Sequence, residues 1–383
     1  MTATGQSGDG ESALPELVAA LLASDQRYRA AGAARRGTLT DEAVLRQLLA
    51  APGTMPDAAA EVLALPDLPA EPAPPADGEV TDRLGPASGA VILRYRRIAT
   101  APPLEGVSAD NLYEHFAVLR REWQPLPLAE LARALRAGSL PERAVAVTFD
   151  NGYGDIAALA VPAARAAGVP VTVFSPAVHW GLGGEHWWDR LALLLLTGDP
   201  VPPLLRLSPG GRELVLPTRT LAERRAALAR VQSVVRPLAA PAREVVLGSV
   251  AEWHGGTPPA PRTLSAEELR GIAGQPGVAI GVQPAGRLPD LAEVALRTEL
   301  ADSQAHLESI LARPVTMVAY PDGDYDDRVL QAVRENGFAV GVTAEARPVM
   351  LDDDPLALPR LSVGDWSAGE FSRRLHAVAA LAG

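Results

Sequence analysis

The sequence predicts an α/β protein in which a distorted barrel of parallel strands and helices follows a small N-terminal helical appendage. Short strand-like runs alternate with helical segments from residue 89 onward, a pattern typical of α/β sheets and barrels. A proline- and alanine-rich stretch separates this region from helically spaced apolar residues nearer the start. The length of 383 residues allows one large core plus an appendage.

The appendage is predicted for residues 1–65. Apolar residues fall at helical spacing over 13–34, a second helix is expected after Thr40, which is a suitable cap, and a third, short helix over 57–65. Residues 66–88 have the composition of an extended linker. We therefore expect the barrel to occupy residues 89–383.

Within the barrel region the predicted strands and helices follow one another in strict alternation. Strands are predicted over 90–98, 144–150, 169–175, 277–282, 315–321 and 338–343, and helices over 111–123, 161–168, 265–275, 296–311 and 326–337. Residues 198–263 break the pattern and read as an insertion or lid with a helix near 221–235. In such barrels the functional residues lie at the carboxyl ends of the strands.

Composition excludes several classes of function. The formal net charge of −11 and the lack of a basic stripe argue against nucleic-acid binding. The chain has no cysteine, which excludes disulfides and thiolate chemistry. The polar, acidic start does not resemble a secretory signal, and no apolar run reaches the roughly 20 residues of a membrane span. We expect a cytoplasmic protein with no membrane span.

The segment TFDNGYGD, residues 148–155, is the first candidate for chemistry. A predicted strand delivers Asp150 and Asn151 into a glycine-flanked turn, and Asp155 could cap the following helix. A carboxylate at such a strand end can act as a general base. It can equally bind backbone amides and shape the turn, and the local sequence leaves both readings open.

Several motifs in order resemble the polysaccharide deacetylase family, the NodB-homology carbohydrate esterases. They are TFDNGYGD, AVILRYRRIA, GEHWWDRL, PVTMVAYPDG and LPRLSVGDW, and the likeness extends over residues 88–375. The resemblance implies the deacetylase barrel, with Asp150 as the catalytic base. It also implies a zinc or similar ion bound by a second aspartate and two histidines four residues apart.

The positions that correspond to these three metal ligands hold Asn151, Gln283 and Arg287. Carboxamides are weak ligands, and a guanidinium cannot give up its proton to bind a cation. Arg96 stands where the family has a histidine, and Asp322 stands where it has a tyrosine. We therefore expect a degenerate member of the family without a metal cofactor.

A buried carboxylate that has lost its metal needs another positive partner. We hypothesise that Arg287, together with Arg96, pairs with Asp150; alternatively, Arg287 points to solvent. These three are the candidate catalytic residues. The candidate substrate-binding residues are Asn151, Gln283, Trp187, Trp188, Tyr320, Asp322, Asp365 and Trp366.

Three functions remain open from the sequence. The first is a pseudoenzyme that binds a carbohydrate or another small molecule, or that serves as an auxiliary subunit docking through its N-terminal helices. The second is a metal-independent hydrolase of C–N bonds, in which Asp150 is the base and Arg287 or Arg96 stabilises the oxyanion. The third is an active sugar N-deacetylase.

Overall fold

The computed structural model describes residues 89–98, 104, 106–176, 184–198, 200–256, 258 and 260–382. The helices expected in residues 1–65 and the linker expected at 66–88 lie outside the described residues, so the domain boundaries and the partner expected for those helices stay predictions. Among the helices that are described, none has both the length and the apolar character needed to cross a membrane.

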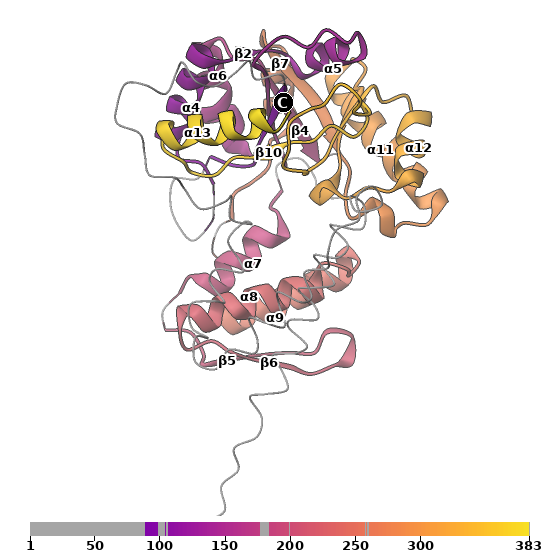
Figure 1. The fold of residues 1–383 in the computed structure, drawn as a ribbon. Helices are drawn as coiled ribbons and strands as arrows, with labels where there is room; N and C mark the ends of the chain where they lie inside the picture. The colour runs from indigo at the N-terminus through magenta and orange to yellow at the C-terminus, as the bar shows by residue number, and fades with distance from the viewer. Residues whose placement is uncertain are drawn as a thin grey trace, which may run out of the picture. The chain divides into compact units, whose positions relative to one another are not determined.

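An all-parallel sheet forms the centre of the barrel, as predicted (Figure 1). Its strands follow the order β10 (Leu361–Ser362), β1 (Val91–Tyr95), β3 (Ala144–Phe149), β4 (Val171–Pro176), β7 (Val278–Gln283), β8 (Met317–Ala319) and β9 (Val340–Val342), and β2 (Gln124–Pro125) also pairs with β3. Leu358 forms a parallel bridge with Val342, whereas Leu361 pairs with Leu93. The segment 358–362 therefore contacts both edges of the sheet and curls it into a barrel.

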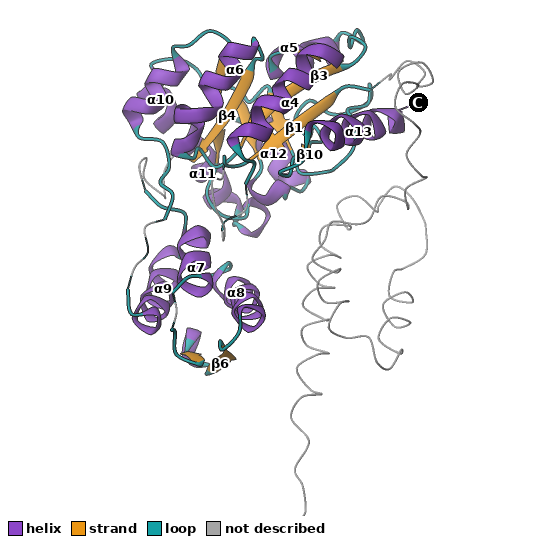
Figure 2. Ribbon diagram, turned by 90° about the vertical axis from the view of Figure 1, so that its left-hand side faces the viewer, coloured by secondary structure: helices purple, strands orange, loops and turns teal. Residues whose placement is uncertain are grey.

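Helices flank this sheet (Figure 2). They are α4 (Ala109–Glu122), α5 (Leu128–Arg136), α6 (Val161–Ala167), α10 (Ala266–Ala273), α11 (Glu293–Leu311), α12 (Asp327–Glu335) and α13 (Ala368–Ala379). Local signals set their ends: the Ser265 and Glu268 side chains cap α10 reciprocally, and Gly168 ends α6 in the left-handed conformation. The sequence predicts all of these helices except α5, since FSRRLHAV near the C-terminus reads as a basic amphipathic helix and corresponds to α13.

Side chains on the two faces of the strands belong to two hydrophobic cores. In β1, Val91, Leu93 and Tyr95 belong to the large cluster that includes the helices, whereas Ile92 belongs to a smaller cluster with the inner residues of the barrel. Because side chains of a strand alternate between its faces, Arg94 lies on the Ile92 face and so points toward the barrel interior.

The insertion forms a small unit with its own core. It contains α7 (Trp187–Leu196), the antiparallel pair β5 (Leu204–Leu207) and β6 (Leu214–Pro217), α8 (Leu221–Val235) and α9 (Ala240–His254). Leu191, Leu205, Val231 and Leu247 are buried together in its hydrophobic cluster. The predicted helix near 221–235 is present, and Thr220 and Glu223 form the capping box that starts it. The α7 and α9 helices and the hairpin were not anticipated.

Candidate functional site

Asp150 lies directly after β3, at the carboxyl end of the sheet, and its carboxylate is bound by two arginines. Arg360 Nη1 lies 2.6 Å from Oδ1 and Arg360 Nη2 lies 2.9 Å from Oδ2, a bidentate pair, and Arg94 Nε lies 3.0 Å from Oδ2. All three side chains are buried. Asp150 is thus held in place by two guanidinium groups.

Burial alone would raise the pKa of Asp150, because it disfavours the charged form. The positive charges of Arg360 and Arg94 and the hydrogen bond from Arg360 outweigh burial and hold the pKa of this carboxyl below its ordinary value. Asp150 is therefore ionised at neutral pH and is a weak proton acceptor.

Arg360 comes from the segment that closes the barrel and fills its interior. Its Nε donates to the Thr343 carbonyl at 2.7 Å, and Nη1 also donates to Thr148 Oγ1 at 3.0 Å. The guanidinium lies 5.7 Å from the centre of the Phe174 ring. This fully buried side chain is therefore matched by polar and aromatic partners.

The pairing expected between Arg287 and Asp150 is wrong. Arg287 donates through Nε to Asp324 Oδ2 at 2.8 Å and through Nη1 to Asp290 Oδ2 at 3.1 Å. It sits at the start of a short turn of helix, beside these two acidic side chains. Arg96 is exposed and affects Asp150 only through its charge. Arg360 and Arg94 provide the counter-charge instead.

The residues at the three expected ligand positions contact one another or other groups. Asn151, in the left-handed conformation at φ 69°, donates its backbone N–H to Gln283 Oε1 at 2.7 Å. Arg287 is engaged by Asp324 as described above. Within the described part of the chain, no group of three or more His, Cys, Asp or Glu side chains could hold a metal ion. An amide, a second amide and a guanidinium do not fit the zinc expected of the family.

His186 was not singled out as a site residue, but it contacts the same turn. Its Nε2 lies 2.9 Å from the Asn151 carbonyl, which can only accept, so Nε2 carries the proton. Burial lowers the pKa of His186 to about 4, and the imidazole is neutral. Its Nδ1 is a buried acceptor without a hydrogen-bond partner among the described residues. The ring stacks on Trp188 at 4.3 Å.

A buried polar network lies behind this aromatic pair. Tyr153 donates its hydroxyl to Asp189 Oδ2 at 2.7 Å and accepts from Trp188 Nε1 at 3.1 Å. Arg97 Nη1 lies 3.8 Å from Asp189 Oδ1. Asp155 occupies the N-cap position of the short helix over Ile156–Ala160, but its side chain makes no capping hydrogen bond there, and its Oδ2 accepts from the Ile98 N–H at 3.2 Å. This network fixes the start of α7 against the turn after β3.

Replacing Asp155 by asparagine is expected to stabilise the protein at neutral pH by about 1–2 kcal/mol. Burial, only partly opposed by Arg97, raises the pKa of Asp155 to about 6. Below its unfolded pKa of about 3.9, a carboxyl with a raised native pKa makes its full contribution to the stability of the folded state. This contribution is lost as the pH rises through the native pKa, which is about 6 for Asp155. The advantage of Asp155→Asn should therefore appear between those values and level off above them.

Urea unfolding of both proteins across this pH range measures the effect. Asp327→Asn, at an exposed position of α12, is the control and should show no such trend. A constant difference between Asp155→Asn and the parent from acid to neutral pH would contradict the expectation.

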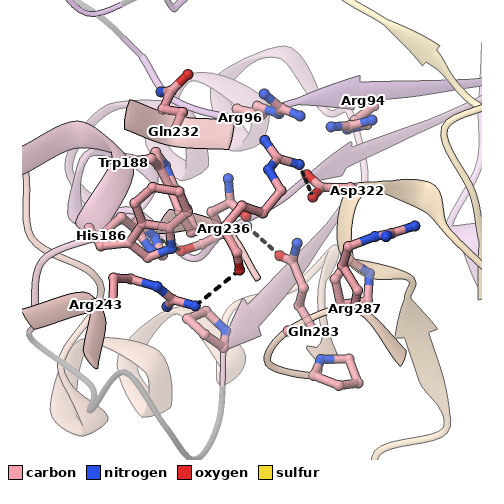
Figure 3. Close-up of a pocket in the computed structure, with 16 residues that line it drawn as sticks. Arg94, Arg96, His186, Trp188, Gln232, Arg236, Arg243, Gln283, Arg287 and Asp322 are labelled. Carbon is pink, nitrogen blue, oxygen red and sulfur yellow. Dashed lines mark hydrogen bonds and ion pairs between the residues drawn. The ribbon is translucent and has the colours of Figure 1, made fainter. Parts of the chain in front are cut away.

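A cavity of about 320 Å³ opens between the carboxyl end of the sheet and the insertion (Figure 3). Of the predicted site residues, seven line it: Arg96, Asn151, Trp187, Trp188, Gln283, Arg287 and Asp322. Asp150 lies beneath it, bound to Arg94. The other lining residues are Arg94, Pro176, His186, Gln232, Arg236, Arg243, Pro284, Gly286 and Pro321.

Three predicted substrate-binding residues lie elsewhere. The buried Tyr320 donates its hydroxyl to the Leu356 carbonyl at 2.6 Å. Asp365 accepts from the Ser108 N–H and hydroxyl, both at 2.8 Å, and so ties the last strand to the start of α4. Trp366 lies under the guanidinium of Arg374 at 4.7 Å. The contacts of all three hold elements of the barrel together.

Four further arginines of the site were not predicted from the sequence. The alternation in ILRYRRI could have indicated Arg94, because it shares a face with Arg96 in the strand predicted over 90–98. An arginine directly before the last strand could have indicated Arg360. No local pattern in the insertion distinguishes Arg236 or Arg243 from its many other arginines.

No protein-family model matches the chain. Two curated bacterial proteins match shorter segments. They are "Putative polysaccharide deacetylase YxkH" of Bacillus subtilis, 30% identical over 73 residues, and poly-beta-1,6-N-acetyl-D-glucosamine N-deacetylase of Escherichia coli, 32% identical over 114 residues. The matches cover 19% and 28% of this chain but only 26% and 17% of those proteins.

Solved structures match most of the described chain. IcaB from Ammonifex degensii aligns with a TM-score of 0.51 at 16% identity, over 77% of this chain and 98% of its own. The Streptococcus pyogenes deacetylase PplD, in complex with acetate, aligns with a TM-score of 0.50 at 16% identity, over 76% of this chain and 99% of its own. The chain has the polysaccharide deacetylase fold. The barrel predicted from the motifs is therefore confirmed.

Proposed function

We propose that this polysaccharide deacetylase-like protein is a pseudoenzyme that binds a saccharide in the cavity above Asp150 and does not perform metal-dependent deacetylation. The observation that carries the proposal is the donor set at the expected metal position. The Gln283 side chain accepts from the Asn151 backbone N–H, and the Arg287 guanidinium is paired with acidic neighbours. No deprotonated ligand is available from these three side chains.

The state of Asp150 favours binding over hydrolysis. A general base works best when its pKa lies near the working pH, whereas the pKa of Asp150 lies below its ordinary value. Its two oxygens are both bound by arginine. Arg287, the expected oxyanion stabiliser, is likewise engaged by Asp324 and Asp290. A metal-independent amide hydrolase would need these groups to be free to act.

A carbohydrate is the ligand class that the relatives support, since one of them is named as an N-deacetylase of a β-1,6-linked N-acetylglucosamine polymer. The half-buried Trp188 beside the cavity adds a surface of the kind on which sugar rings stack.

Two measurements test the proposal. The purified protein, exchanged against excess zinc and then desalted, should retain a substoichiometric amount of the metal. The same sample should release no acetate from N-acetylglucosamine oligomers. One zinc per chain together with acetate release would make the protein an active deacetylase and overturn the proposal.

A further inference from the structure

We infer that the cavity takes an acidic saccharide, a sugar that carries a carboxylate or a phosphoryl group. The inference rests on the proposed saccharide-binding function and adds the charge of the ligand. Its basis is the side chains around the cavity, where five arginines and one aspartate meet in a chain whose formal net charge is −11. The arginines are Arg94, Arg96, Arg236, Arg243 and Arg287 (Figure 3).

Part of this positive charge is compensated within the protein. Arg236 Nη1 lies 2.6 Å from Asp322 Oδ2, which joins the insertion to the loop after β8. Arg287 is paired with both Asp324 and Asp290. Neither of these arginines carries the inference.

Positive charge gathers at the end of β1. Arg94 and Arg360 both pair with the single carboxylate of Asp150. Arg96 lies just beyond Tyr95, the last residue of β1, and lines the cavity. It is exposed, and no described residue forms an ion pair with it. A planar guanidinium in this position suits the paired oxygens of a carboxylate or phosphoryl group.

Arg243 supports the wall of the cavity on the insertion side. Its Nη2 donates to the Leu238 carbonyl at 2.8 Å, and its guanidinium lies 4.9 Å from the centre of the Trp187 ring. Burial lowers its pKa, but from a value so high that the group stays charged at neutral pH. Its charge therefore adds to the positive potential of the cavity.

Neutral groups complete a saccharide site next to this charge. Gln283 uses Oε1 to accept from Asn151, which leaves its NH2 group to donate toward a ligand. The cavity volume, about 320 Å³, is at the lower end of the about 300–1,000 Å³ common for small-molecule sites and suits a ligand of one or two rings. A deacetylated amino sugar is cationic, and these arginines would repel it.

Isothermal titration calorimetry with four probes tests the inference. The acidic probes are a glucuronate-containing disaccharide and N-acetylglucosamine 6-phosphate, and they separate a carboxylate from a phosphoryl group. Their comparators are the neutral N-acetylglucosamine disaccharide and the cationic glucosamine disaccharide. We expect at least one acidic probe to bind about ten-fold or more tightly than both comparators, and its affinity to fall as salt increases.

Variants of Arg96 locate the binding. Arg96→Ala removes a charged donor and should weaken binding of the acidic probe about ten-fold or more, whereas Arg96→Lys should lose less because it keeps the charge. The control is Arg206→Ala, which removes an exposed arginine of β5 that pairs with Glu213 and does not line the cavity. Thermal unfolding checks that all variants are folded.

The outcomes separate the two proposals. Tighter binding of the neutral disaccharide, failure of both acidic probes to bind at millimolar concentration, or equal losses in Arg96→Ala and Arg206→Ala would overturn the anionic ligand. None of these results would restore metal-dependent activity. Zinc binding with acetate release would instead overturn the pseudoenzyme, whatever the preferred charge of the ligand.

Discussion

Replacing Asp150 by asparagine is expected to destabilise the protein by about 3–5 kcal/mol, because it removes the carboxylate that two buried guanidinium groups share. Arg360→Met should cost less. It removes one cation and leaves the neutral pair of Asp150 and Arg94, with the loss of the hydrogen bonds from Arg360 to Thr148 and Thr343. Urea unfolding at neutral pH measures both changes.

The pH dependence provides an internal control. A carboxyl whose native pKa is lowered makes its full contribution to folding stability above its unfolded pKa, which is about 3.9 for aspartate. This contribution is lost as the pH falls through the native pKa. The difference between Asp150→Asn and the parent should therefore be constant from about pH 5 upward and shrink only in acid. If Arg360→Met lost more stability than Asp150→Asn, the charges of Asp150, Arg94 and Arg360 would not balance as we describe.

Restoring the family's ligand types should create a zinc site. The triple change Asn151→Asp, Gln283→His and Arg287→His supplies one carboxylate and two imidazoles, the oxygen and nitrogen donors that zinc accepts, and removes the positive charge of Arg287. We expect zinc affinity to rise by about 100-fold or more over the parent. Binding should weaken in acid, because protonated histidine cannot coordinate.

Metal analysis after desalting and competition with a colorimetric chelator measure this gain. Asn151→Asp alone is the matched control, since one added carboxylate should retain little zinc. If the triple variant binds no more zinc than this control, the three positions do not form a ligand set, and our interpretation of the departures from the family motifs is wrong.

The sequence predicted the barrel well because its signals are local. Buried runs such as AVAVTF and helix ends such as Gly168 need only neighbouring residues to be recognised. The insertion gave weaker signals: Pro241 and Gly248 interrupt the pattern of α9, and α7 is apolar on most sides, so its LALLLL run shows no clear period.

The partners of Asp150 could not be predicted in this way. Physical chemistry indicated that the carboxylate needs a positive partner, which is correct, but a motif-based choice named Arg287. Arg360 lies 210 positions away in sequence. Only the curl of the sheet, which places the last strand beside β1, brings the two together.

The segment 358–362 also has a consequence for the order of folding. It closes the barrel and carries Arg360, so the segment that joins the two sheet edges also brings a guanidinium to Asp150 beneath the cavity. Contacts across such long sequence separations form slowly, because chain entropy is lost before they stabilise the protein. We therefore expect the binding cavity to mature last, after the helices and inner strands have assembled.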